Sequence, residues 1–190
     1  MRIVGGSLRG AALANLGAGD DAAHLRPTTD RVREAVFNLI AHGGYATPAP
    51  PVGARVLDLF AGSGALGFEA LSRGAVHLTS VENGKTGARL IQQNMRALNV
   101  ADRVTLLRQD ATALGPCTAE PASLVFLDPP YGKGLGARAL AAARQGGWLT
   151  DSALVVWEDS VESPPPPGFM LEDVRRYGST IIQLLTASAP

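Results

Sequence analysis

The chain has 190 residues, 46% of them hydrophobic, and its 17 basic and 17 acidic side chains give a formal net charge of +0. This length and composition suit one globular domain and exclude a disordered chain, and the single cysteine, Cys117, excludes an intrachain disulfide. No apolar run approaches the roughly 20 residues that cross a bilayer, and MRIVGGSLRG is too short and glycine-rich for a signal peptide. We therefore expect a cytoplasmic protein without a membrane partner or a metal.

The first 50 residues are predicted to be an appendage to a core that spans residues 51–190. A proline-rich stretch, TPAPPVG at residues 47–53, separates the two and is typical of a linker. Within the appendage, residues 2–13 (RIVGGSLRGAAL) can form a small hairpin with a glycine-rich turn.

A helix is predicted within residues 26–40, RPTTDRVREAVFNLI. Three residues near its start have side chains that can cap a helix: Thr28, Thr29 and Asp30. The apolar side chains with helical spacing are Val32, Ala35, Val36, Leu39 and Ile40. We expect this stripe to bury against the core, which leaves Arg31 and Arg33 on or beside the opposite face.

From residue 54 onward, strand and helix patterns alternate. Strands are predicted at residues 54–60, 76–82, 103–110, 123–128 and 153–159, and helices at 64–74, 85–100 and 135–147. Such alternation implies a parallel sheet with helices on both faces. Residues 169–187 are two extended runs with a turn near Gly178, so we expect an antiparallel pair at one edge of the sheet.

The loop after the first predicted strand carries Gly62, Gly64 and Gly67 in G-x-G-x-x-G spacing. Glycines in this pattern make a tight turn that brings the backbone close to a ligand at a helix N-terminus. Glu82 ends the next strand about 20 residues on, where its carboxylate can accept hydrogen bonds from both hydroxyls of a ribose. The pattern predicts a cofactor that contains a nucleoside.

Asp58 indicates which cofactor this is. A dinucleotide would place a pyrophosphate over the loop, close to the Asp58 carboxylate, whereas S-adenosylmethionine has no phosphate and carries an ammonium and a sulfonium. Asp58 can also cap the turn by accepting loop N–H bonds, which is compatible with the same cofactor. At the end of the third strand, Asp110 can accept from an adenine amino group, with the N–H of Ala111 near a ring nitrogen.

The fourth predicted strand runs into Asp128, Pro129, Pro130 and Tyr131. Ligands of doubly wound sheets bind beyond the carboxyl ends of the strands, so this motif should face the cofactor. Asp128 and the carbonyl of Pro129 can accept both N–H bonds of an exocyclic amine, and Tyr131 offers a ring on which an unstacked base can lie. The prolines hold these groups in place, and a paired base must first be extruded to reach them.

Several stretches together resemble the bacterial 16S ribosomal RNA guanine-N2 methyltransferases of the RsmD family. They are MRIVGGSLRG, LRPTTDRVREAVFNLI, VLDLFAGSGALGFEALSRGA, VEN, DPPYGKG and YGSTIIQLL, in that order, and RPTTDRVRE is the most specific. The resemblance implies an α/β, Rossmann-like class I methyltransferase with a seven-stranded, mostly parallel sheet. It implies S-adenosylmethionine as donor, S-adenosylhomocysteine as product, and a guanine of 16S ribosomal RNA in the small subunit or its precursor as acceptor. We expect a monomer.

The motifs and the resemblance together assign roles to particular positions. The cofactor residues are expected to be Asp58, Phe60, Ala61, Gly62, Ser63, Gly64, Glu82, Asn83, Asp110 and Ala111. The catalytic residues are expected to be Asp128, Pro129, Pro130 and Tyr131. The residues expected beside the mouth of the site, where they engage RNA or order a lid over the cofactor, are Arg26, Thr28, Thr29, Arg31 and Arg33.

Other functions stay open from the sequence alone. An adenine-N6 methyltransferase on RNA or DNA would use the same Asp-Pro-Pro-Tyr geometry, because that geometry serves any amino group conjugated to a ring. A non-catalytic RNA-binding assembly factor could retain the fold, although the intact acids and glycines argue against a decayed site. An NAD-dependent oxidoreductase is disfavoured by Asp58 and by the Pro-Pro-Tyr sequence.

Overall fold

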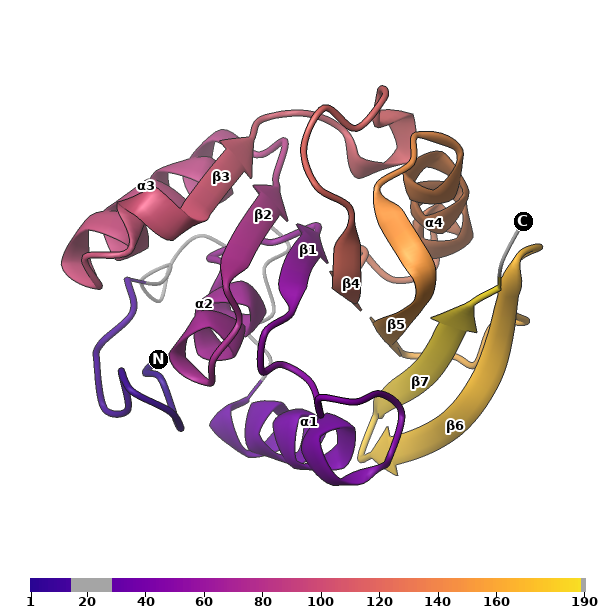
Figure 1. Ribbon diagram of the computed structural model, residues 1–190, viewed down its shortest axis with the longest axis horizontal. Helices are drawn as coiled ribbons and strands as arrows, with labels where there is room; N and C mark the ends of the chain where they lie inside the picture. Colours follow the sequence, from indigo (N-terminus) through magenta and orange to yellow (C-terminus); the bar gives the residue numbers. More distant parts are fainter. Residues whose placement is uncertain (15–28, 189–190) are drawn as a thin grey trace.

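The computed structural model describes residues 1–14 and 29–188, which form alternating strands and helices (Figure 1). The strands are β1 (Arg55–Leu59), β2 (His77–Val81), β3 (Val104–Leu107), β4 (Ala122–Leu127), β5 (Leu149–Asp159), β6 (Phe169–Tyr177) and β7 (Thr180–Ala187). The helices are α1 (Asp30–His42), α2 (Ala65–Ser72), α3 (Lys85–Ala97) and α4 (Leu135–Gln145), with short 3-10 turns η2 (Ala101–Arg103) and η3 (Ala111–Ala113). The alternation predicted from residue 54 onward is confirmed.

The strands form one sheet in the order β3-β2-β1-β4-β5-β7-β6. The first five strands pair in parallel, and β7 lies antiparallel between β5 and β6. The predicted antiparallel pair at one edge is therefore confirmed. The chain moves outward from β1 through β2 to β3 and then returns to the other side of β1 with β4, so the strand order reverses between β1 and β4. Ligands of such sheets bind at that reversal, beyond the carboxyl ends of the strands.

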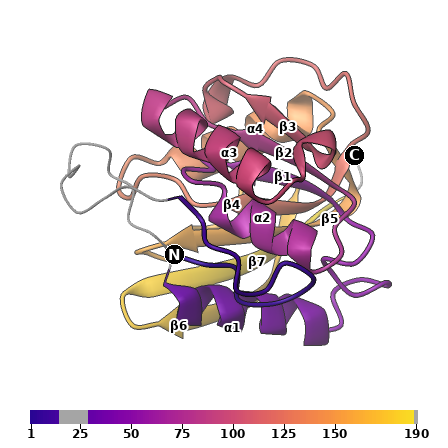
Figure 2. The same ribbon diagram turned by 90° about the vertical axis from the view of Figure 1, so that its left-hand side faces the viewer.

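Each face of the sheet has its own apolar cluster, because successive side chains of a strand point to opposite faces. On one face, α1, α2 and α3 pack on residues such as Val56, Phe126 and Val156. On the other face, α4 packs on residues such as Leu57 and Leu127. Both views show α1 beside the hairpin of β6 and β7 (Figures 1 and 2).

The N-terminal segment shares the core of the sheet. Arg2 and Ala12 form an isolated antiparallel bridge, which closes the predicted hairpin, and Figure 2 shows this segment crossing α2. Ile3 and Leu13 are buried in the same cluster as Phe68 of α2. Although a proline-rich stretch lies at residues 47–53, the segments before and after it bury side chains in the same core cluster.

Two structural features bear on the kind of protein. Among residues 1–14 and 29–188, no helix combines the length and the apolar character that crossing a bilayer requires. Over the same residues, no group of three or more histidine, cysteine and acidic side chains is arranged to hold a metal ion.

Candidate active site

The glycine loop makes a sharp turn from β1 into α2. Phe60, Gly62 and Gly64 all have positive φ angles, of 61°, 57° and 79°. The N–H of Gly64 donates to the carbonyl of Ala61 at 2.7 Å, and Gly64 is the N-cap of α2. A Cβ at Gly64 would lie 2.6 Å from the ring of Phe68, so only glycine fits both the backbone angle and the space.

Glu82 holds this loop from the end of β2. Its Oε2 accepts from the N–H of Gly62 at 2.8 Å, and its Oε1 accepts from the N–H of Gly84 at 2.6 Å. Each carboxylate oxygen can accept a second hydrogen bond, so both remain able to receive a ribose hydroxyl. The structure thus brings the glycine loop and the predicted ribose acid together.

Asn94 of α3 also holds the glycine loop, through a hydrogen bond to Ser63. Its side-chain amide donates to the carbonyl of Ser63 at 3.0 Å, and its Oδ1 accepts from the N–H of Ala14 at 2.7 Å. Asn94 is fully buried and was not among the residues predicted from the sequence. The available signal for it was a polar residue within the apolar face of a predicted helix. Through these contacts Asn94 links the N-terminal segment to the glycine loop.

Asp58 is the second-last residue of β1, just before the glycine loop. It is 3% exposed, and its Oδ2 accepts from the N–H of Gly67 at 3.2 Å. Burial raises the pKa of Asp58 to about 7, with a further increase from the charge of Glu82, while the Gly67 N–H works in the opposite direction. The turn-capping role foreseen for this side chain is therefore present.

Asp110 caps η3 beyond β3. Its Oδ1 accepts from both the N–H and the hydroxyl of Thr112, each at 2.8 Å, and these bonds lower the pKa of Asp110. The next residue, Ala111, is buried, and Asn83 is exposed just after β2. The predicted cofactor positions thus lie at the carboxyl ends of β1, β2 and β3.

The Asp-Pro-Pro-Tyr segment leaves β4 beside the glycine loop. The N–H of Asp128 points to the carbonyl of Leu59 at 3.5 Å, which is long for a hydrogen bond but places the two strand ends side by side. Pro129 is buried, whereas Tyr131 is 36% exposed and points its hydroxyl toward Oε1 of Glu158 at 3.5 Å. Burial, together with the charges of Glu158 and Asp128, raises the pKa of Tyr131 to about 12.

Three acids at the strand ends share one face of the sheet. They lie two residues after Val56, Phe126 and Val156, which all belong to the cluster under α1, α2 and α3: Asp58, Asp128 and Glu158. Burial and then the charges of Glu158, Asp58 and Asp159 raise the pKa of Asp128 well above its usual range. Sequence reasoning missed Glu158, although the rule that singled out Asp58 and Asp128, an acid at a strand's carboxyl end, also applies to it.

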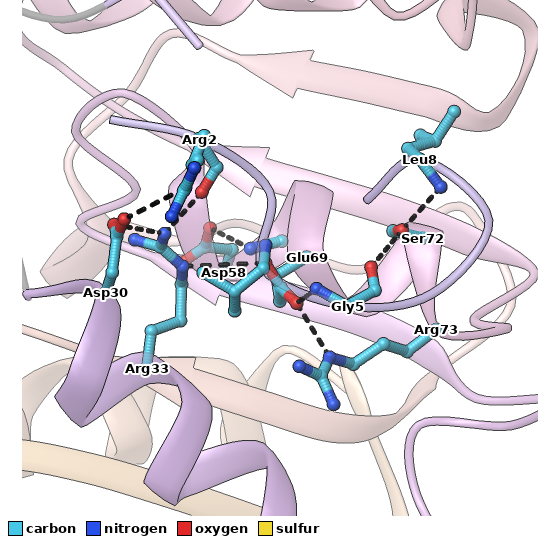
Figure 3. A network of polar contacts seen from close by, with 11 residues as sticks. Arg2, Gly5, Leu8, Asp30, Arg33, Asp58, Glu69, Ser72 and Arg73 are labelled. Carbon is cyan, nitrogen blue, oxygen red and sulfur yellow. Dashed lines mark hydrogen bonds and ion pairs between the residues drawn. The ribbon is translucent and has the colours of Figure 1, made fainter. Parts of the chain in front are cut away.

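Arg33 does not lie where the sequence analysis expected it. The side chain is fully buried, so the prediction of an exposed position is wrong. Its guanidinium donates to Asp30 at 2.8 Å and to the carbonyl of Arg2, and it forms an ion pair with Glu69 at 3.5 Å (Figure 3). Glu69 is also fully buried, so Arg33 points inward from α1 to pair with it. The buried residues of α1 are Arg33, Val36, Phe37 and Ile40.

The other predicted substrate residues have mixed outcomes. Thr29 caps α1, because its hydroxyl accepts from the N–H of Val32 at 3.3 Å. Arg31 is exposed on the first turn of α1. Arg26 and Thr28 lie outside the described residues.

The hydrogen-bond acceptors at this site fit S-adenosylmethionine. Asp58, Glu82 and Asp110 present oxygen acceptors, and within residues 1–14 and 29–188 none of the three forms an ion pair. Carboxylates that have no ion-pair partner attract an ammonium and a sulfonium and repel a pyrophosphate. These three residues would hold the amino acid, ribose and adenine parts of that cofactor.

A sheet of this order, with a glycine loop after β1 and a single antiparallel strand next to β5, is the sheet of the class I methyltransferases. The family model described as conserved hypothetical protein 95 matches residues 1–186. The chain belongs to that family, which is the RsmD family named above.

Individual relatives agree with this assignment. Ribosomal RNA small subunit methyltransferase D of Escherichia coli strain K12 is 38% identical over 166 residues, which cover 87% of this chain and 78% of that protein. The protein of the same name from Haemophilus influenzae is 34% identical over 86% of this chain and 81% of its own length. The solved structure of yhhF from Escherichia coli matches with a TM-score of 0.81 and 34% identity, covering 100% of this chain and 99% of that one.

Proposed function

We propose that this protein transfers a methyl group from S-adenosylmethionine to the N2 amino group of a guanine in 16S ribosomal RNA. The acceptor is the small subunit or its assembly precursor, and the protein acts in the cytoplasm as a monomer. One observation carries the proposal: Asp128 of the Asp-Pro-Pro-Tyr segment lies beside the end of β1, next to the cofactor loop. The names of the relatives, small-subunit RNA methyltransferases, support the RNA substrate.

The amine would be held by Asp128 and the carbonyl of Pro129. Two acceptors fix both N–H bonds, which directs the nitrogen lone pair at the reacting methyl group and stabilises the positive charge that develops on nitrogen. The cofactor supplies an electrophilic methyl group. Once methylated, the nitrogen must lose one proton, and the carboxylate of Asp128, whose pKa is raised by burial and by the charges of Glu158, Asp58 and Asp159, would receive it.

The base would be held by stacking and reached by extrusion. Tyr131 is partly exposed at the mouth of the site, where its ring can stack on a base, an interaction worth roughly 1–3 kcal/mol. The exposed Arg31, together with Arg26, Thr28 and Thr29, would contact the RNA around that base. Arg33 has no part in this contact, because it is buried.

The test is transfer of labelled methyl from S-adenosylmethionine to isolated small subunits, with free 16S RNA and adenine-rich DNA as parallel acceptors. The products are digested and the labelled nucleoside is identified. N2-methylguanine from the subunit or its RNA supports the proposal and shows which form is the substrate. N6-methyladenine would preserve the amine chemistry and overturn the guanine assignment, and no incorporation into any acceptor would overturn both.

A further inference from the structure

Glu158 of β5 is the acid that lies opposite Asp128 across the sheet. The parallel register of β4 and β5 pairs Leu127 with Trp157, so the next residues on the two strands are Asp128 and Glu158. Neighbouring strands lie about 4.8 Å apart, and these two side chains share one face. The carboxylates are therefore adjacent groups at the point where the substrate amine must bind.

The surroundings of Glu158 tie it to the substrate side of the site. Glu158 is 6% exposed, and the hydroxyl of Tyr131, the residue whose ring would stack on the base, points toward its Oε1 at 3.5 Å. The backbone of Glu158 is paired with Ile182 of β7, which fixes its position in the sheet. If a base lies on the ring of Tyr131 with its amine at Asp128, Glu158 therefore faces the ring nitrogen beside that amine.

The hydrogen-bonding edges of the bases distinguish what a second carboxylate can accept. Guanine carries two adjacent donors, the N1–H and the N2 amino group, so two adjacent acceptors suit it. Adenine carries its amino group beside N1, which is an acceptor and would face the carboxylate oxygen without a proton between them. Flipped bases are selected through hydrogen bonds to this edge, and unpaired buried groups make a mismatch costly.

We propose that Glu158 accepts a hydrogen bond from guanine N1–H while Asp128 holds the N2 amine, so that Glu158 selects guanine over bases whose N1 bears no proton. This inference rests on the proposed function and deepens it by naming the residue that reads the base. Asp128 alone would accept any aromatic amine. The pair accepts an amine only beside an N–H donor.

The test substitutes the target guanine by 2-aminopurine, which keeps the N2 amine and lacks the N1 proton. The modified site is first located by mapping the N2-methylguanine, and the base is then introduced by ligation into the RNA that the wild-type protein accepts. Wild-type protein is expected to prefer guanine by about 100-fold or more in kcat/KM. If wild type methylates both RNAs equally, N1–H is not read and the inference fails, whatever any variant does.

The variant Glu158→Gln then assigns the discrimination to this residue. Its amide can accept from the N1–H of guanine or, turned over, donate to N1 of 2-aminopurine, so the preference should fall below about tenfold. Damage to the fold alone would lower both rates and leave their ratio unchanged. An unchanged ratio in Glu158→Gln would overturn the role of Glu158.

Asp159→Asn is the matched control. Asp159 is the next residue, is also buried, and uses its Oδ1 to accept from the N–H of Ser160 at 2.6 Å, a bond that asparagine can keep. The preference for guanine should match the wild type, and an equal loss in both variants would show a general charge effect instead of N1 reading. Absence of N2-methylguanine with wild-type protein is a separate result, because it contradicts the proposed function before any variant is compared.

Discussion

Arg33 and Glu69 form an ion pair between α1 and α2 in which neither side chain is exposed to solvent. Glu69 also accepts from the N–H groups of Val4 and Gly5, each at 2.8 Å, and from Arg73 at 2.7 Å (Figure 3). This single carboxylate thus joins α1, the N-terminal segment and the helix that follows the cofactor loop. The helix start that resembles the RsmD family most specifically contributes to the fold through Arg33.

The replacement Arg33→Ala should destabilise the protein. It leaves a buried carboxylate with less compensation, and breaking one partner of a buried pair costs about 3–5 kcal/mol. Urea unfolding followed by circular dichroism measures this loss. Arg31→Ala, on the exposed face of the same helix, is the control and should change the free energy of unfolding by less than about 0.5 kcal/mol. Equal stability of the two variants would contradict a structural role for Arg33.

Arg31→Ala should instead affect the RNA. If Arg31 contacts one phosphate, its loss raises the KM for the RNA and lowers the slope of log affinity against log salt by about 0.7–0.9. Filter binding over a series of salt concentrations gives that slope. Arg96→Ala is a suitable comparison, because Arg96 is exposed at the far end of α3. A slope for Arg31→Ala equal to that of wild type would remove Arg31 from the RNA interface.

Local patterns were sufficient to predict the sheet. Apolar runs, turn residues and helical spacing are properties of neighbouring residues, so the order of strands and helices and the placement of acids at strand ends followed from the sequence. The charge of Asp58 already favoured S-adenosylmethionine, and the resemblance to a known family added the acceptor, which spacing alone left open.

Contacts between distant segments could not be predicted in the same way. The apolar stripe predicted for α1 included Val36 and Ile40, which are buried, but it left out Arg33. An arginine is ordinarily exposed, and the buried partner of Arg33 is Glu69 on another helix. Glu158 was missed for a related reason. Its position beside Asp128 depends on the register of β5 against β4, which no local pattern specifies.

Asp58 should make the stability of the cofactor-free protein depend on pH. Its pKa is about 7 in the folded protein against an ordinary value of 3.8, so the folded state holds the proton more tightly than the unfolded state. Its contribution to stability is therefore fully present below about pH 3.8 and is lost as the pH rises through 7. In Asp58→Asn, unfolding titrations should show a smaller decline over that range, whereas the exposed Asp102→Asn should follow the wild type. Parallel pH curves for wild type and Asp58→Asn would show that Asp58 titrates normally.

Glu82→Ala should weaken cofactor binding. The substitution removes the acceptor for the N–H groups of Gly62 and Gly84 as well as the proposed partner of the ribose hydroxyls. The dissociation constant for S-adenosylmethionine should rise at least tenfold, about 1.4 kcal/mol, in isothermal titration calorimetry. Glu120→Ala serves as a control, since the Glu120 side chain is 78% exposed and far from the loop in sequence. An unaltered constant for Glu82→Ala would exclude the ribose role.

Asp128→Ala should separate chemistry from cofactor binding. The variant loses the proposed acceptor for the substrate amine, and removing one such preorganised group costs about 100- to 1,000-fold in kcat. Binding of S-adenosylmethionine should stay close to the wild-type value, because the cofactor loop is held by Glu82 and Asn94 and not by Asp128. Single-turnover methyl transfer with saturating RNA, measured beside calorimetric cofactor binding, distinguishes the two effects. Full turnover in Asp128→Ala would sink the amine-orienting role, and a parallel loss of cofactor binding would show that Asp128 supports the cofactor site instead.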